Sequence, residues 1–271
     1  MIDANPIIQN LLQANPLREP TLRSIIYSLQ LPRGSRGLDA GCGIGLQSIL
    51  LAETVGAEGH VTGLDIMPEL LAYGEDLSAK AGLSSRVAFR AGDVSCLPFE
   101  EDRFDWAWSA DCIGYPAGDL MPPLQELIRV VKPGGKIILL GWSSQQLLPG
   151  YPLLEARLNA TCSGYIPFLK NKGPELHFMR ASGCFRNLGL EAVAARTFVG
   201  EVQAPLTHGE RIALTSLFEM LWSSPQSEAS VEDRAQYKRL CNPGSPDFIL
   251  DIPDYYGFFT YSIFHGKVTK R

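Results

Sequence analysis

The sequence predicts an α/β fold in which a mostly parallel sheet carries helices on both faces. Between Arg36 and Trp142, short runs of β-forming residues alternate with segments of helical periodicity. A glycine-rich turn, "GCGIG", joins the first of these strands to the first helix. Because strand–helix–strand crossovers are right-handed, this alternation builds a parallel sheet, and ligands bind such sheets beyond the carboxyl ends of the strands.

Each element of this region has a local signature. Leu46, Ile49 and Leu50 follow the glycines at helical spacing, and Pro68 is placed at the first position of a second helix. A third apolar helical stripe runs over 120–131 and stops at "KPGG". The strands are expected at 36–40, 60–65, 86–93, 104–111 and 136–142.

The rhythm changes after Trp142, where the sequence predicts insertions into the α/β core. Thr207 and Glu210 form a T-x-x-E capping box before an apolar stripe, and another helix is expected after Ser230. A helix over 175–188 and a strand over 190–202 resume the alternation. The expected segments are an N-terminal helical cap (1–36), the ligand-binding core (37–142), a lid insertion (143–174), continued core (175–202), a helical lid insertion (203–254) and a final core strand (255–271).

Composition narrows the function. The formal net charge of −5 argues against a general nucleic-acid binder, which usually carries a basic excess. The start of the sequence lacks a secretory signal, and no apolar run approaches the about 20 residues of a membrane span. Six scattered cysteines without a C-x-x-C pair are typical of reduced thiols in a cytoplasmic protein, and they give no reason to expect a metal site.

The glycine stretch raises the question of what approaches its backbone. Gly41, Gly43 and Gly45 permit a sharp turn and a close ligand, although a turn that binds nothing is an alternative. The spacing differs from the dinucleotide fingerprint G-x-G-x-x-G. Asp39, two residues before the first glycine, would repel a pyrophosphate and would suit a positively charged amino group. The stretch therefore favours a ligand with an amino-acid tail.

Two further acids close the next strands. Asp65 can accept both hydroxyls of a ribose, and Asp93 can accept the exocyclic amine of adenine while the Val94 N–H faces a ring nitrogen. The alternatives are a helix N-cap for Asp65 and a turn aspartate for Asp93. Taken together, acids at three successive strand ends fit one ligand, an adenosine that bears an amino-acid tail.

Four ordered motifs, "LDAGCGIG", "GLDIMPELL", "AGDVSCLPFEEDRFDWAWS" and "RVVKPGGKIILLGW", resemble those of class I S-adenosylmethionine-dependent methyltransferases. The similarity covers 37–142 and is strongest to the subgroup of ubiquinone and menaquinone biosynthesis enzymes. It implies S-adenosylmethionine as cofactor and a Rossmann-like sheet of seven strands, the last antiparallel. The cofactor-binding residues that it implies are Asp39, Gly41, Cys42, Gly43, Gly45, Asp65, Ile66, Met67, Gly92, Asp93, Val94, Ser109 and Ala110.

Departures from the family pattern affect the acceptor side. Trp106 and Trp108 replace small aliphatic residues, and "DCIGYPAGD" replaces a pair of histidines that relatives often carry past the fourth strand. Asp111 and Tyr115 are therefore the candidates for contact with the acceptor. The aromatic residues expected either to wall the acceptor pocket or to pack the insertions' own core are Tyr165, Phe168, Phe218, Trp222 and Tyr255.

The predicted function is methyl transfer to a small-molecule acceptor by in-line displacement. Protein or RNA methylation, aminopropyl transfer and a non-catalytic adenosyl-binding module are the alternatives. A general base is optional, because a thiol or amine acceptor does not require one. The sequence leaves the acceptor and the oligomeric state open.

Overall fold

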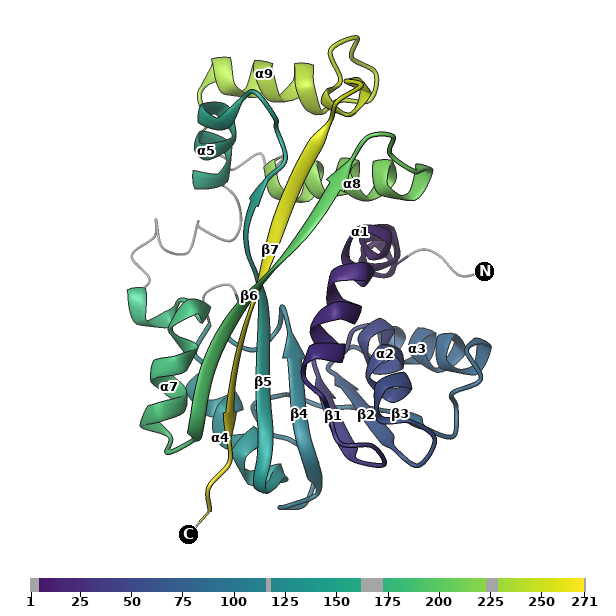
Figure 1. Cartoon of the computed structure of the whole chain (residues 1–271), viewed down its shortest axis with the longest axis vertical. Helices are drawn as coiled ribbons and strands as arrows, with labels where there is room; N and C mark the ends of the chain where they lie inside the picture. The colour runs from purple at the N-terminus through teal and green to yellow at the C-terminus, as the bar shows by residue number, and fades with distance from the viewer. Residues whose placement is uncertain (1–4, 116–117, 162–172, 223–228, 271) are drawn as a thin grey trace. The chain divides into compact units, whose positions relative to one another are not determined.

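The computed structural model describes residues 5–115, 118–161, 173–222 and 229–270. Its centre is a seven-stranded sheet with the order β3-β2-β1-β4-β5-β7-β6, in which β7 is antiparallel. This arrangement confirms the predicted Rossmann-like fold (Figure 1). The strands are β1 (Arg36–Ala40), β2 (His60–Asp65), β3 (Val87–Ala91), β4 (Phe104–Ala110), β5 (Val131–Gln146), β6 (Glu191–Gln203) and β7 (Tyr256–Lys267).

The strand order reverses beside β1. The chain moves outward from β1 through β2 to β3 and then returns to β4, which pairs in parallel with the other edge of β1. Gly37 and Asp39 of β1 face Trp106 and Trp108 of β4 in this register. The carboxyl ends of β1 and β4 therefore form the position where doubly wound sheets bind their ligands.

Helices pack on both faces of this part of the sheet. On one face, Leu38 and Leu64 join a buried cluster with α4 (Met121–Val130) and α7 (Ala181–Asn187). On the other face, Gly63 lies against Phe89, whose ring also approaches Gly74 of α3 (Pro68–Lys80). Helix α2 (Leu46–Val55) runs beside α3, as Figure 1 shows. Alternation of side chains along each strand assigns the two sets to opposite faces.

The two unexpected tryptophans are accommodated by their neighbours. A Cβ atom at Gly37 would stand 2.0 Å from the Trp106 ring, so only glycine leaves room for that indole. Trp106 Nε1 donates to Ser35 Oγ at 2.8 Å, and Trp108 Nε1 donates to the Gln47 side chain at 2.8 Å. Both indoles are therefore buried with their N–H groups satisfied.

The chain divides into two compact units. One comprises Leu22–Trp142, Pro174–Phe198 and Ser262–Arg271, and it contains β1 to β4 with α2, α3, α4 and α7. The other comprises Met1–Thr21, Ser143–Gly173 and Val199–Tyr261. Its helices include most of α1 (Pro6–Ser28), α5 (Pro152–Ala160), α8 (His208–Trp222), α9 (Val231–Cys241) and the short η3 (Ile249–Asp251).

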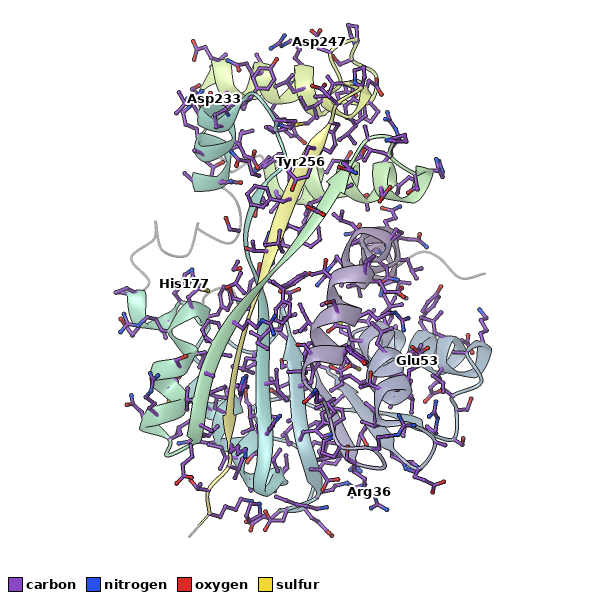
Figure 2. The ribbon with its side chains drawn as sticks, in the orientation of Figure 1. Arg36, Glu53, His177, Asp233, Asp247 and Tyr256 are labelled. Atoms are coloured by element: carbon purple, nitrogen blue, oxygen red, sulfur yellow. The ribbon has the colours of Figure 1, made fainter. Side chains whose placement is uncertain are left out.

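Polar side chains join the helices of this second unit. The buried carboxylate of Glu155 accepts the backbone N–H groups of Leu147 at 2.7 Å and Leu148 at 2.9 Å. The Arg157 guanidinium donates to the Asp233 carboxylate at 2.9 and 2.8 Å. These contacts tie α5 to the end of β5 and to α9, where Figure 2 labels Asp233.

Most predicted helix starts are confirmed. Thr207 Oγ1 accepts the Glu210 N–H at 3.2 Å, and the Glu210 carboxylate accepts the Thr207 N–H at 2.7 Å. Ser230 caps α9 by accepting the Asp233 N–H at 3.0 Å.

The helix expected over 175–188 is not continuous. Two single 3₁₀ turns, η1 (Pro174–Leu176) and η2 (Phe178–Arg180), precede α7. His177 accepts the Met179 N–H. The Phe178 ring packs against Gly141, where a Cβ atom would stand 2.5 Å from the ring. Tertiary burial of this ring and the capping bond therefore interrupt the helix.

Candidate functional site

The glycine loop after β1 needs glycine for two reasons. Gly41, Gly43 and Gly45 have φ values of 80°, 55° and 75°, which side-chain-bearing residues rarely adopt. A Cβ would also stand 2.2 Å from Cys112 Sγ at Gly41 and 2.5 Å from the Phe89 ring at Gly45. The loop is held to β2, because the Gly41 and Cys42 N–H groups donate to the Leu64 carbonyl at 2.7 and 2.9 Å. Positive φ angles, close side chains and two hydrogen bonds to β2 thus fix the backbone of this loop.

Asp39 is a buried acid at the end of β1. Its side chain is 2% exposed, and its Oδ2 accepts the Ser48 hydroxyl at 2.6 Å. Burial raises the pKa of Asp39 to about 7, the Ser48 hydrogen bond opposes this rise, and the charge of Asp65 adds to it. The carboxyl group therefore titrates near neutrality and would be stabilised in its ionised form by a cationic partner.

Asp65 connects the end of β2 to the glycine loop. Its Oδ2 accepts the Gly43 N–H at 2.9 Å, and its Oδ1 accepts the Met67 N–H at 3.1 Å. The second bond is local, but Met67 is the N-cap residue of α3 and no side chain caps that helix, so Asp65 is not the N-cap of the alternative interpretation. The neighbouring Ile66 is 67% exposed although it is a large apolar residue. An apolar side chain held in solvent beside an acid at a strand end is suited to a planar ring of a ligand.

Asp93 has the contacts of a turn residue. It is exposed, and its Oδ1 accepts the Ser95 N–H at 2.7 Å. The preceding Gly92 donates its N–H to the Asp65 carbonyl at 3.0 Å, which brings this turn beside the end of β2. Val94 packs against the buried cluster of the core. The role of Asp93 and Val94 at an adenine edge stays a prediction.

The end of β4 holds Ser109, Ala110 and both acceptor-side candidates. Ser109 is buried and accepts the Ile113 N–H at 3.4 Å, while Ala110 is half-buried. Asp111 has a φ of 50°, and its Oδ1 accepts the Trp142 N–H at 2.8 Å. It therefore joins the end of β4 to Trp142 within β5.

Tyr115 packs edge-on against Phe178 at a centroid distance of 5.2 Å. Catalytic roles for Asp111 and Tyr115 stay predictions.

Two thiols lie within the same cluster of groups. Burial raises the pKa of Cys42, and the charges of Asp39 and Asp65 raise it further. Burial and the charges of Asp65 and Asp39 raise the pKa of Cys112 to about 11. Both groups are therefore thiols at neutral pH and poor nucleophiles. Within the described ranges, no group of histidine, cysteine and acidic side chains could hold a metal ion.

The aromatic residues of the insertions belong to the core of their own unit where the structure describes them. Phe218, Trp222 and Tyr255 are 0%, 3% and 1% exposed. Phe218 stacks on Trp222, and the Tyr255 hydroxyl donates to the Leu147 carbonyl at 3.1 Å. The packing interpretation therefore accounts for these three residues. Tyr165 and Phe168 lie outside the described residues.

Three residues of the site were missed by sequence reasoning: Ser48, Phe89 and Cys112. Ser48 lies in the first turn of α2, directly after the glycines, so a hydroxyl at this position was a usable signal for a partner of Asp39. Phe89 and Cys112 gave no local signal, because both are distant from the loop in the sequence. Phe89 reaches it from β3, and Cys112 reaches it from the segment after β4.

The assembled groups fit an adenosyl amino acid. The three glycines hold the loop in a positive-φ conformation, and Asp39 places a buried carboxyl group directly before it. Asp65 and Ile66 follow at the end of the adjacent strand. No helix among the described residues combines the length and hydropathy that crossing a membrane requires.

Comparison with known proteins agrees with this geometry. A family model described as "Methyltransferase domain" matches residues 32–178, more than half of the chain. Tocopherol O-methyltransferase, chloroplastic, of Arabidopsis thaliana is 35% identical over 122 residues, which is 44% of this chain and 33% of that protein. Demethylmenaquinone methyltransferase of Listeria monocytogenes is 36% identical over 126 residues, which is 45% of this chain and 51% of that protein.

The chain thus spans about a third to a half of the length of these curated relatives. The crystal structure of the YcgJ protein from Bacillus subtilis is 18% identical with a TM-score of 0.55, and the match covers 92% of this chain and 99% of that one. At this identity the likeness supports the fold alone. The family model is the finding that confirms the resemblance of the motifs. The chain belongs to the class I S-adenosylmethionine-dependent methyltransferase domain family.

Proposed function

We propose that this chain binds S-adenosylmethionine at the glycine loop and transfers its methyl group to a small-molecule acceptor. The observation that carries the proposal is the buried Asp39 carboxyl group, 2% exposed, beside a loop whose glycines all have positive φ. A carboxylate in this position repels a diphosphate and attracts an ammonium group. The arrangement therefore favours a donor with an amino-acid tail over a dinucleotide.

Each part of the donor has a proposed partner. Asp39 holds the ammonium group, Asp65 accepts the ribose hydroxyls, and Ile66 packs on the adenine ring. The remaining residues surround these groups mainly through backbone or apolar contact. They are Gly41, Cys42, Gly43 and Gly45 at the tail, Met67, Gly92, Asp93 and Val94 at the adenine, and Ser109 and Ala110 at the methionine part.

The catalytic contribution of the protein is chiefly positioning. When bound, the donor supplies an electrophilic methyl group on a cationic sulfur. Asp39 and Asp65 fix the two ends of that molecule, and exclusion of water from the loop favours alignment with the acceptor. For a hydroxyl acceptor, the Asp111 carboxylate is the proposed proton acceptor, and Tyr115 is proposed to contact the acceptor molecule.

The acceptor class rests on the relatives and on charge. The two curated relatives are named for tocopherol and demethylmenaquinone, both small molecules. The net charge of −5 disfavours RNA as the acceptor. These observations support a small molecule without identifying it, and they leave the contribution of the insertions to acceptor binding as a prediction.

The test has a binding arm and a turnover arm. Calorimetry with the donor and with NAD should show saturable binding of the donor alone, and an Asp39→Asn variant should bind it at least about tenfold more weakly because an ionic partner is lost. Tight binding of NAD with none of the donor contradicts the proposal. Formation of demethylated product with a panel of phenols and quinols supports transfer, whereas donor binding without turnover on any acceptor class favours a binding module.

A further inference from the structure

A cavity opens at the other end of the sheet from the glycine loop. It has a volume of about 220 Å³ and lies at the amino ends of β1, β2, β3 and β4. Figure 2 labels Arg36, which begins β1 at this end. The polar residues that line the cavity are Arg36, His60, Thr62, Ser84, Ser85, Arg86 and Arg103.

The cavity exists because one face of the sheet is not fully covered. The chain passes from β3 to β4 through residues 92–103, all described, without forming a helix there. Thr62 pairs with Ala88 in register, and both line the cavity. Ala88 and Arg90 are exposed. Since β3 is the edge strand of the sheet, this open region lies at the margin of the core.

Side-chain alternation concentrates positive charge at this opening. Arg36 pairs with His60 in register, so their side chains share a face with Thr62 two residues further along β2. Arg86 precedes β3, and Arg103 precedes β4. Three arginines from different segments thus line one cavity of a chain whose net charge is −5.

One carboxylate acts on this cluster, since the charge of Arg36 interacts with the Asp105 side chain. In the part of the chain that the structure describes, none of the three lies in a salt bridge. Asp105 accepts the backbone N–H of Arg36 at 2.7 Å, but its other oxygen is bound by Lys132 Nζ at 2.7 Å. Arg103 lies over the Phe99 ring, with its Cζ 5.4 Å from the centroid. The cluster therefore retains excess positive charge.

We propose that this cavity is a binding site for the phosphate group of a small phosphomonoester. Guanidinium groups match a phosphate with paired N–H donors, and three of them suit a dianion better than a single carboxylate. The hydroxyls of Ser84 and Ser85 supply further donors at the rim. The small volume and the position between strand ends favour one phosphate-bearing metabolite over an extended polymer.

The site is separate from the proposed donor site and does not depend on it. Arg36 and Asp39 stand three positions apart on β1, so the cavity and the glycine loop lie at opposite ends of that strand. Phosphate binding can therefore be measured whether or not the donor binds.

The test uses the whole chain and calorimetry at constant ionic strength. Inorganic phosphate and glycerol 3-phosphate are titrated in parallel with acetate, and vesicles containing phosphatidic acid form a separate arm. We expect saturable binding of both soluble phosphates, at least about tenfold tighter than acetate, because a dianion engages more than one guanidinium group.

Variants locate the binding. Arg86→Gln should weaken phosphate binding about tenfold or more, and Arg86→Lys should weaken it less, because the charge is kept while the paired donors are lost. Both variants keep the backbone bonds of Arg86 to Leu83 and Val61, so the local fold is retained. Arg90→Gln is the matched control, since Arg90 is exposed, lies over Phe99 and does not line the cavity.

Unchanged phosphate affinity in Arg86→Gln, or an equal loss in Arg90→Gln, overturns the proposal. Absence of saturable binding to either soluble phosphate also overturns it, as does binding confined to the vesicles.

Discussion

Replacing Ser48 by alanine tests the proposed role of Asp39. The Ser48 hydroxyl donates to Asp39 Oδ2 at 2.6 Å, and both side chains are buried. Removing this hydroxyl takes away a hydrogen bond to the Asp39 carboxyl group. The proposed contacts between the protein and S-adenosylmethionine stay the same. Since the hydrogen bond favours the ionised form, its loss raises the pKa of Asp39 above about 7.

The size of the effect follows from the strength of that bond. A hydrogen bond to a charged group contributes about 1.5–3 kcal/mol, which corresponds to about one to two pKa units. Half of the wild-type Asp39 side chains are ionised at a pH equal to their pKa of about 7. In the variant this fraction falls to roughly 1–10%, so donor affinity at pH 7 falls about five- to fiftyfold, in proportion to the competent fraction.

The direction in which donor affinity changes with pH distinguishes this explanation from others. The pKa of Asp39 is raised, so the neutral acid predominates below pH 7 and donor affinity rises as pH increases through 7. In Ser48→Ala this rise moves to higher pH, and the difference from wild type shrinks to less than about fivefold at pH 8.5. The affinity of wild type and of Ser48→Ala is measured by calorimetry from pH 6 to 8.5. The ligand is the demethylated product of the donor, which keeps the same amino-acid tail.

Ser78→Ala is the matched control, because Ser78 is also a buried helical serine but donates to the Glu75 carbonyl instead of a carboxylate. Its affinity profile should match that of wild type. If Ser48→Ala binds like wild type at every pH, or if its deficit is equal at all pH values, the assignment of Asp39 to the ammonium group is wrong.

The remaining predictions address the ribose site, the sheet and one helix. Asp65→Ala should lower donor affinity by about 1.5–3 kcal/mol in calorimetry, and a folded variant with unaltered affinity would refute the ribose assignment. Gly37→Ala should destabilise the chain by about 1–3 kcal/mol in urea unfolding, because the new Cβ would stand 2.0 Å from the Trp106 ring. Adding Trp106→Leu should restore part of this loss, whereas no recovery would point to a backbone effect. Thr207→Ala should lower the free energy of unfolding by about 1 kcal/mol, since Glu210 loses its capping partner. Urea unfolding followed by circular dichroism measures this change, and an unchanged free energy would contradict the prediction.

Much of the fold was accessible from the sequence. Strands β1 and β2 occur over the predicted residues, and the capping box at Thr207 forms with the expected bonds. The helix expected over 175–188 was wrong as a continuous element. Periodicity did not reveal that Phe178 would pack over Gly141, because that contact joins residues far apart in the chain.

The candidate site was only partly accessible. The acids at the ends of β1 and β2 and the positive-φ glycines were predicted from spacing, and the structure brings them together. The bond from Asp111 to the Trp142 N–H and the contact of Cys112 with Gly41 were not predicted, since each depends on which strand ends become neighbours.

The sequence alone determined the succession of strands and helices along the chain from Arg36 to Trp142, the glycine loop and the acids that follow the strands, because backbone conformation and side-chain period are local properties. Only the tertiary structure decided that Ser48 would face Asp39, that Trp106 would lie over Gly37, and that three arginines would meet at one cavity. Those contacts depend on the register and order of the assembled sheet, which bring distant residues within bonding distance.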